Sequence, residues 1–249
     1  MNERIRVGVG GWTFEPWRDN FFPKGLPHAR ELQYASRQLT TIEVNGTYYS
    51  TMKPATFAKW RDETPDGFMF TVKANRFATN RKVLASAGES IERFVASGIG
   101  ALGDRLGPIL WQFMPTKKFE PGDFAAFLKL LPRETAGRPL RHVLDVRHDS
   151  FHCDEYLDLA RRHGCSTVHT DSAKFPNIAD AAGELAYLRL MRSEADRATG
   201  YPPALLDQWA LGCKAWTQKG SQREVFCFFI NGAKERAPAA ALELIRRLR

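Results

Sequence analysis

The residues of this sequence that could carry chemistry are charged side chains near the ends of short apolar segments. Three acidic and three basic residues make up the set: Glu43, Asp145, Asp171, Lys73, Arg147 and Arg189. Carboxylates and lysines are suited to acid–base catalysis, and a lysine whose pKa is lowered can attack a carbonyl carbon. Arginine and lysine bind carboxylate and phosphate groups. The set predicts acid–base chemistry on a small anionic or sugar-like, phosphorylated substrate, and the catalytic candidates are Glu43, Lys73, Asp145 and Asp171.

Eight segments rich in β-branched and aromatic residues are expected to form the strands that position these side chains. They span residues 5–9, 41–45, 68–73, 109–113, 142–147, 166–171, 186–191 and 225–230. Segments with helical periodicity lie between them, over residues 54–60, 124–131, 154–162, 204–219 and 239–248. Strands that alternate with helices, at roughly thirty residues per unit, are typical of an α/β barrel of the TIM type with parallel strands. We expect one such domain over residues 1–249, with an open doubly wound sheet as the alternative.

Alternation of side chains along a strand predicts which of them face the barrel interior. In most of the segments the residues of the charged set alternate with aliphatic residues. The charged side chains therefore share one face of the strand, and the aliphatic side chains share the other. The same rule turns Asp171 inward together with His169, and Asn231 inward together with Phe229. Burial of an unpaired charge costs several kcal/mol, so equal numbers of acidic and basic residues suggest mutual ion pairs. A salt-bridge network that only fills the barrel is the alternative, but six charges exceed what packing needs, which favours a polar pocket at the C-terminal ends of the strands.

Metal and cofactor chemistry have weaker signals. His148 and His152 lie four residues apart and close to Asp145, which is a spacing that could seed a divalent metal site. Simple hydrogen bonding by the two histidines is the favoured interpretation, and no metal is predicted. The glycines between residues 8 and 13 resemble a dinucleotide loop, but Thr13 stands where the third glycine belongs. A tight turn after the first strand is favoured there, and no cofactor is predicted.

Aromatic residues and one further histidine leave two interpretations open. Trp12, Phe14 and Trp17 could stack on a sugar or a base, or they could pack over the barrel mouth. His169 could be an acid–base group or a hydrogen-bonded histidine of the core. The sequence favours neither side in either case.

The composition favours anionic partners. The chain has 249 residues, and 36 Lys and Arg against 28 Asp and Glu give a net charge of +8. These charges are scattered, so a solvated surface accounts for most of them. No run of 18 apolar residues indicates a spanning helix, and no signal peptide is recognised. The four cysteines never form a CxxC pair, which is consistent with reduced thiols and a cytoplasmic protein without membrane contact.

The sequence resembles the YecE-like proteins, the family called domain of unknown function seventy-two. The motifs that carry the resemblance are residues 10–12, 17–18, 43–49, 70–74, 106–115, 145–151, 171–172, 186–189 and Tyr201. They cover essentially the whole chain in the order of the family. The resemblance implies a TIM-type barrel that is distantly related to sugar isomerases, and this analogy concerns the fold. The charged residues themselves predict isomerase-like or hydrolase-like activity on a sugar or a phosphorylated metabolite.

The resemblance also implies ligand-binding residues at the strand ends. These candidates are Trp12, Asn45, Thr47, Tyr48, Gln112, Arg147, His148, Tyr187, Arg189 and Asn231. The chain departs from the family at three places. Asp145 stands where glutamate is usual, Met191-Arg192 replaces a common His-Gly pair, and Asn231-Gly232 replaces a paired asparagine. These departures imply a different ligand and concern mainly the side of the pocket formed by the seventh and eighth strands.

Two other classes of function remain open from the sequence. A non-catalytic barrel that binds nucleic acid or another anionic ligand is the main alternative to an enzyme, because aromatic side chains stand beside basic ones and the pI is near 9.5. A protein-interaction barrel with a vestigial pocket is the third. The oligomeric state is not predicted.

Overall fold

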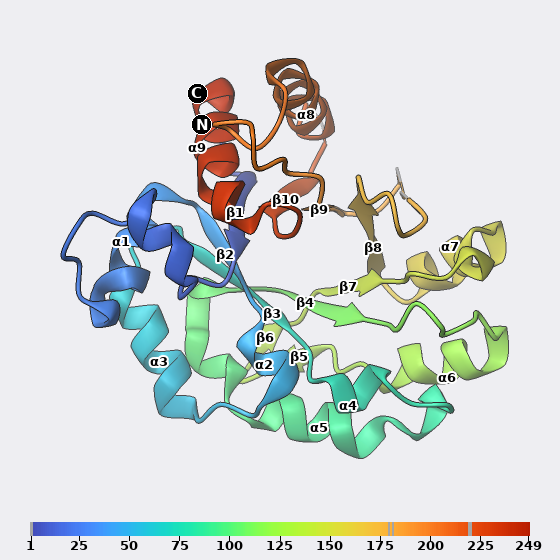
Figure 1. Ribbon diagram of the computed structural model, residues 1–249. Coiled ribbons are helices and arrows are strands. Elements are labelled where there is room, and N and C mark those ends of the chain that lie inside the picture. The colour runs from blue at the N-terminus through green and yellow to red at the C-terminus, as the bar shows by residue number, and fades with distance from the viewer. Residues whose placement is uncertain (1, 179, 181, 219–220) are drawn as a thin grey trace.

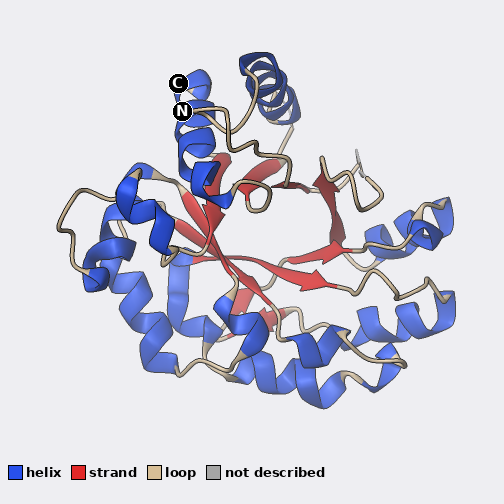
Figure 2. Ribbon diagram, viewed as in Figure 1, coloured by secondary structure: helices blue, strands red, loops and turns tan. Residues whose placement is uncertain are grey.

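Parallel strands close into a barrel in the computed structural model, which describes residues 2–178, 180, 182–218 and 221–249 (Figures 1 and 2). The barrel strands are β1 (Ile5–Gly10), β2 (Thr41–Val44), β3 (Met69–Lys73), β4 (Leu106–Gln112), β7 (His142–Asp145), β8 (Cys165–Thr170), β9 (Leu185–Leu190) and β10 (Glu224–Phe229). Pairing of β1 with β10 closes the ring. A short antiparallel hairpin of β5 (Glu134–Thr135) and β6 (Arg138–Pro139) lies outside it. The predicted TIM-type barrel and its eight strands are confirmed, and the open sheet is wrong.

Helices surround the barrel and connect most of its strands (Figure 2). They are α1 (Glu31–Gln38), α2 (Gly46–Tyr49), α3 (Pro54–Glu63), α4 (Arg76–Thr79), α5 (Gly88–Ala96), α6 (Pro121–Leu130), α7 (Asp154–Arg162), α8 (Pro203–Trp216) and α9 (Ala237–Leu248). Proline stands in the first turn of α3, α6, α8 and α9, where its missing N–H costs no hydrogen bond. Among the described residues, none of these helices has both the length and the apolar character to cross a membrane.

The five predicted helices are present; α7 has the predicted bounds, and the other four have shifted ends. The helix predicted over residues 204–219 ends at Trp216, and its predicted last residue, Lys219, lies outside the described residues. Helices α1, α2, α4 and α5 were not predicted from the sequence. Strict alternation of strand and helix also fails once, because the described residues between β8 and β9 contain no helix.

The apolar core has two layers, one inside the barrel and one between strands and helices. The inner layer is made of Leu110, Val143, Val168, Leu185, Tyr187, Met191, Phe226, Phe228 and Ile230. The outer layer is larger and rich in aromatic side chains; Trp111, for example, is fully buried and contacts the rings of Phe94 and Phe127. Side chains of one strand therefore contribute alternately to the two layers.

The predicted inward face is correct for β2, β3, β4, β7 and β9 but wrong for β8. Val168 belongs to the inner layer, whereas Thr167 and His169 face the helices. The Thr167 hydroxyl is hydrogen-bonded to Tyr156 of α7 at 2.9 Å, and the His169 ring packs edge-on against Trp209 of α8 at 5.5 Å. A hydrogen bond to α7 and packing against aromatic rings of α8 hold these two side chains on the outer face of β8. His169 is thus a packed histidine outside the barrel mouth.

The inward face of β10 was also predicted wrongly. Phe228 and Ile230 point into the barrel, and Phe229 packs against Tyr201 on the outside. Both faces of this strand are apolar, so polarity along the strand gave no basis for choosing the inner one. Asn231 follows the strand and lies at the cavity mouth even though Phe229 does not face inward.

Gly8 of β1 lies so close to the backbone of β2 that a larger residue there should destabilise the barrel. A Cβ atom added at Gly8 would lie 1.8 Å from the backbone oxygen of Thr41, the residue with which Gly8 pairs. We expect Gly8→Ala to lower the free energy of unfolding by about 1–3 kcal/mol or more, because backbone must move to remove the clash. Urea denaturation measures it. Gly122→Ala is the matched control, since the space around Gly122 in α6 is open and alanine favours a helix; equal stability of the two variants would contradict the predicted clash.

Candidate functional site

A cavity of about 630 Å³ opens at the C-terminal ends of the strands. The predicted site residues that line it are Trp12, Asn45, Lys73, Gln112, Arg147, Arg189 and Asn231. They come from the ends of β3 and β4, from within β9 and from the segments that follow β1, β2, β7 and β10. Tertiary structure thus brings together seven of the residues that the sequence singled out.

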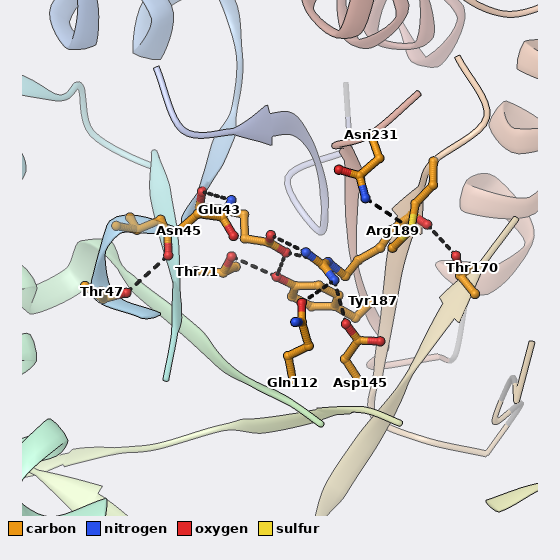
Figure 3. A network of polar contacts seen from close by, with 12 residues as sticks. Glu43, Asn45, Thr47, Thr71, Gln112, Asp145, Thr170, Tyr187, Arg189 and Asn231 are labelled. Carbon is orange, nitrogen blue, oxygen red and sulfur yellow. Dashed lines mark hydrogen bonds and ion pairs between the residues drawn. The ribbon is translucent and has the colours of Figure 1, made fainter. Parts of the chain in front are cut away.

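Arg189 of β9 is the centre of the polar network beneath this cavity (Figure 3). Its Nε and Nη2 atoms donate to the two carboxylate oxygens of Glu43 at 3.0 and 2.9 Å. Its Nη1 atom donates to Asp145 Oδ2 at 2.5 Å and to Gln112 Oε1 at 3.2 Å. Burial alone would lower the pKa of Arg189, but the carboxylates of Glu43 and Asp145 raise it. The guanidinium of Arg189 is therefore a permanent buried cation.

Glu43 of β2 is fully buried and does not line the cavity. Besides the two bonds from Arg189, its Oε2 atom accepts a hydrogen bond from the Tyr187 hydroxyl at 2.9 Å. The Tyr187 proton is used in that bond, so the Thr71 hydroxyl donates to the Tyr187 oxygen at 2.9 Å. Burial raises the pKa of Tyr187 well above its usual value. Glu43 and the protonated Tyr187 therefore form a hydrogen-bonded layer that supports the cavity floor.

Arg147, which follows β7, is held by the same carboxylate as Arg189. Its Nε and Nη2 atoms donate to Asp145 Oδ2 at 3.2 and 2.8 Å, and Nη2 also donates to Gln112 Oε1 at 2.9 Å. The guanidinium lies 4.4 Å from the centre of the Phe175 ring. Gln112 and Asp145 are register partners in β4 and β7, so the sheet itself places the two shared acceptors side by side. Both arginines are thereby fixed before any ligand arrives.

Lys73 is the buried cation of the site that lacks a close anionic partner. Its side chain is only 6% exposed, and Nζ lies 4.0 Å from the centre of the Tyr48 ring. Within the described part of the chain, no oxygen accepts a hydrogen bond from this Nζ atom. Burial first, and then the charge of Arg189, lower the pKa of Lys73 to about 8. The ammonium and the free amine are therefore both populated near neutral pH.

The structure does not place Asp171 in the cavity, contrary to the prediction. The backbone N–H of Met191 donates to Asp171 Oδ1 at 2.6 Å, and the Tyr201 hydroxyl donates to Oδ2 at 2.8 Å. Asp171 follows β8, whose parity is the reverse of the predicted one, and its bonds tie the loop after β8 to the loop after β9. Of the three acidic and three basic residues expected together, two acidic and three basic residues remain at the site. The site has an excess of positive charge.

Three predicted ligand-binding residues other than Tyr187 lie behind the cavity wall. The Thr47 hydroxyl donates to the Lys73 carbonyl at 2.7 Å, and the Tyr48 ring supports the Lys73 ammonium. His148 Nδ1 accepts a hydrogen bond from the Ser150 N–H at 3.1 Å. These residues position the loops that carry the lining side chains.

Asp145 and His148 do not come together as ligands of a metal site. Asp145 Oδ2 is taken by two arginines, and His148 is turned toward Ser150. Over the described ranges, no group of three His, Cys, Asp or Glu side chains has an arrangement that could hold a metal ion.

Sequence reasoning missed Lys234 and several apolar lining residues. Lys234 lies half-buried after β10, with Nζ 4.4 Å from the centre of the Phe14 ring, and burial lowers its pKa. No strand-end pattern marked it, because it stands in a short 3-10 turn past the last strand. The three aromatic residues after β1 have different positions. Trp17 is fully buried and donates from Nε1 to the Lys234 carbonyl at 2.8 Å, whereas Trp12 and Phe14 line the cavity.

Removal of Arg189 tests the network. We expect Arg189→Met to lower the free energy of unfolding by about 3–5 kcal/mol, because Glu43 would remain buried without its counter-charge. The double variant Glu43→Gln/Arg189→Met should lose less than the single variant, since no unpaired carboxylate remains at position 43. Arg162→Met on the exposed end of α7 is the control and should change stability by less than about 0.5 kcal/mol. Urea unfolding measures all three; a double variant less stable than Arg189→Met would contradict the proposed pairing.

The lowered pKa of Lys73 predicts a pH dependence of stability. Between pH 8 and 10.5 the unfolded chain binds a proton at this lysine that the folded chain has lost, so folded stability rises with pH across this window. The full rise is about 3 kcal/mol. Lys73→Met should lack it, and exposed Lys24→Met should retain it, in urea unfolding at pH 7, 8, 9 and 10. Parallel curves for wild type and Lys73→Met would show that burial does not lower the pKa.

Comparison with known proteins places the chain in a family. The YecE protein of Escherichia coli K12 is 27% identical over 150 residues, which are 59% of this chain and 50% of YecE. The chain thus spans about half the length of this curated relative. A family model described as "Protein of unknown function DUF72" matches residues 6–249.

Solved structures agree with the fold. A DUF72 family protein from Thermotoga maritima matches with a TM-score of 0.76 and 22% identity, over 98% of both chains. D-Allulose 3-epimerase from Methylomonas sp., solved with D-allulose, matches with a TM-score of 0.55 and 12% identity, over 99% of this chain and 98% of that one. At these identities the likeness shows a shared barrel fold. Together with the match of the family model over nearly the whole sequence, which confirms the predicted YecE-like resemblance, this means that the chain belongs to the DUF72 family.

Proposed function

We propose that the barrel mouth binds a small anionic, sugar-like metabolite and that Lys73 performs an acid–base step on it. The observation that carries the proposal is the charge of the cavity wall. Apart from Tyr49, the ionisable side chains among the described lining residues are all cations: Lys73, Arg147, Arg189 and Lys234. The two carboxylates of the network lie behind this wall and already accept hydrogen bonds from arginines. A phosphate or carboxylate group of a ligand would supply the missing negative charge.

The two arginines suit an anion clamp because their orientation is fixed in advance. Asp145 and Gln112 hold both guanidinium groups, so little side-chain entropy is lost when a ligand binds. Charge-assisted hydrogen bonds from such groups are strong and directional. Asp145 and Glu43 serve in this proposal as positioning residues for the arginines, while the reacting group is the Lys73 amine.

Lys73 is suited to proton transfer because its pKa is close to neutral pH. The free amine can remove a proton from a carbon or hydroxyl group, and the ammonium can return it, as an isomerase-like or hydrolase-like reaction requires. The rings of Trp12 and Phe14 line the same cavity and offer apolar surface for a sugar ring. The barrel likeness to an epimerase solved with D-allulose is consistent with a sugar-like ligand.

The proposal extends to the cellular setting. We place the protein in the cytoplasm, which the four free cysteines support, three of them buried. The proposed chemistry uses side chains of this chain, and no cofactor is part of it.

Calorimetry with matched sugars tests the proposal. Glucose 6-phosphate and gluconate should bind, and glucose should bind at least about 10-fold more weakly, because it lacks the charge that the arginines recognise. Binding at pH 8 should be accompanied by proton uptake, visible in buffers of different ionisation enthalpy, because a bound anion raises the pKa of Lys73. Lys73→Met should abolish this uptake, and Lys24→Met should not.

Two outcomes would contradict the parts of the proposal separately. Glucose that binds as tightly as its phosphorylated and oxidised forms would overturn the anion clamp. Once a substrate is found, turnover by Lys73→Met would overturn the acid–base role and leave a ligand-binding barrel.

A further inference from the structure

A second cavity of about 560 Å³ lies beside the barrel mouth, between the loops that follow β3 and β4. We name it the basic groove, because four of its nine lining residues are the cations Arg81, Lys82, Lys117 and Lys118, against one acidic residue, Glu120. The groove is distinct from the cavity of the proposed function, with which it shares no lining residue. Nothing in the fold of the barrel requires a cluster of like charges at this point.

Two of these four cations are free to meet a ligand. Lys117 Nζ donates to Asp123 at 2.9 Å, and Arg81 donates to the Phe77 carbonyl at 2.7 Å and to the Ser90 hydroxyl of α5 at 2.9 Å. Lys82 and Lys118 are exposed, and neither Nζ atom has a hydrogen-bond or ion-pair partner over the ranges that the structure describes. The groove therefore presents uncompensated positive charge to solvent.

Exposed apolar side chains lie on the loops that form the groove and on the neighbouring segment after β2. Of the six large hydrophobic residues that are exposed in the described part of the chain, four lie on the segments after β2, β3 and β4: Tyr49 at 65%, Phe77 at 62%, Val83 at 52% and Met114 at 42%. The Arg76 guanidinium lies 5.5 Å from the centre of the Phe77 ring. Met114 lines the groove, and the Phe77 carbonyl accepts a hydrogen bond from the lining residue Arg81 at 2.7 Å. Scattered exposed apolar residues need no explanation, but apolar surface that adjoins cations in this way indicates a binding surface.

This surface is continuous with the barrel mouth. The short helices α2 and α4 are tied together, because Asn75 Nδ2 donates to the Thr47 carbonyl at 3.4 Å and Asn80 Nδ2 donates to the Tyr48 hydroxyl at 3.1 Å. Tyr49 lines the mouth, and Asn80 lines the groove. A chain-like ligand could therefore contact the groove and reach the mouth.

We propose that the basic groove binds a single-stranded polynucleotide, with phosphates against Lys82 and Lys118 and a base stacked on Phe77. Such a ligand combines a regular series of negative charges with flat apolar rings, and both features of the surface are then used. A second copy of this chain fits less well, because a symmetric contact would bring the same cations face to face. The concave shape also fits a strand better than a flat anionic membrane.

Fluorescence anisotropy with a labelled fifteen-residue oligothymidylate tests this assignment across a range of salt concentrations. Lys82→Ala/Lys118→Ala should weaken binding and reduce the slope of log K against log salt by about 1.4, because two phosphate contacts are lost. Phe77→Ala should weaken binding about 10-fold without a change of slope, because stacking carries no charge. All of these side chains are exposed, so the variants should keep the wild-type Tm.

Matched controls remove the same groups elsewhere. Lys24→Ala/Arg162→Ala deletes two exposed cations away from the groove, and Leu211→Ala deletes an apolar side chain on α8 that is 67% exposed. Both should bind as the wild type does. The polynucleotide assignment is tested at exposed residues of the groove and the anion clamp is tested with small sugars at the barrel mouth, so failure of one and failure of the other are separate results.

Several results would overturn the assignment. They are absence of binding at 50 mM salt, equal loss in the control variants, equal affinity for inorganic polyphosphate with no effect of Phe77→Ala, or preferential binding to vesicles of anionic phospholipid. A dimer in light scattering that Phe77→Glu dissociates would show instead that the surface joins two copies of this chain.

Discussion

A guanidinium group inside a barrel is stable only if its charge and its N–H groups are matched where water is excluded, and the rest of this site depends on how that is done. Arg189 is matched by Glu43 and Asp145, which come from strands on different sides of the ring. The two hydrogen bonds from Arg189 to Glu43 offset part of the cost of desolvating both charges. They form only when β2 and β9 face each other across the barrel interior. The network therefore links barrel closure to the position of the cavity floor.

The same network decides which charges remain for a ligand. Asp145 accepts hydrogen bonds from two arginines, and Gln112 is the second acceptor that they share. The carboxylates of the network are therefore already paired within the protein. Lys73 is left with an aromatic ring as its nearest partner. An internal salt-bridge network and a polar pocket were competing interpretations of one set of residues. The structure contains both: a paired layer below and a cationic layer above.

The positive charge of the chain is also unevenly compensated. Many exposed ion pairs join neighbours on one helix, such as Lys59 with Glu63 and Arg246 with Glu243, and these contribute little to stability. They fit the expectation of a solvated surface. The barrel mouth and the basic groove differ because their cations outnumber nearby carboxylates, and both lie at the C-terminal side of the strands where the barrel fold gathers loops.

The sequence by itself determined the strands, the barrel and the residues of the charged core, because alternation along a strand is local and a charged residue among aliphatic neighbours stands out. It placed Glu43, Lys73, Asp145 and Arg189 on the inner face correctly. Only tertiary structure decided the faces of β8 and β10, since Thr167 and His169 found partners on α7 and α8, and β10 is apolar on both sides. Tertiary structure also brought Lys234 to the mouth and the lysines of two separate loops to one groove, because such proximity depends on how distant segments pack and leaves no periodic signal in the chain.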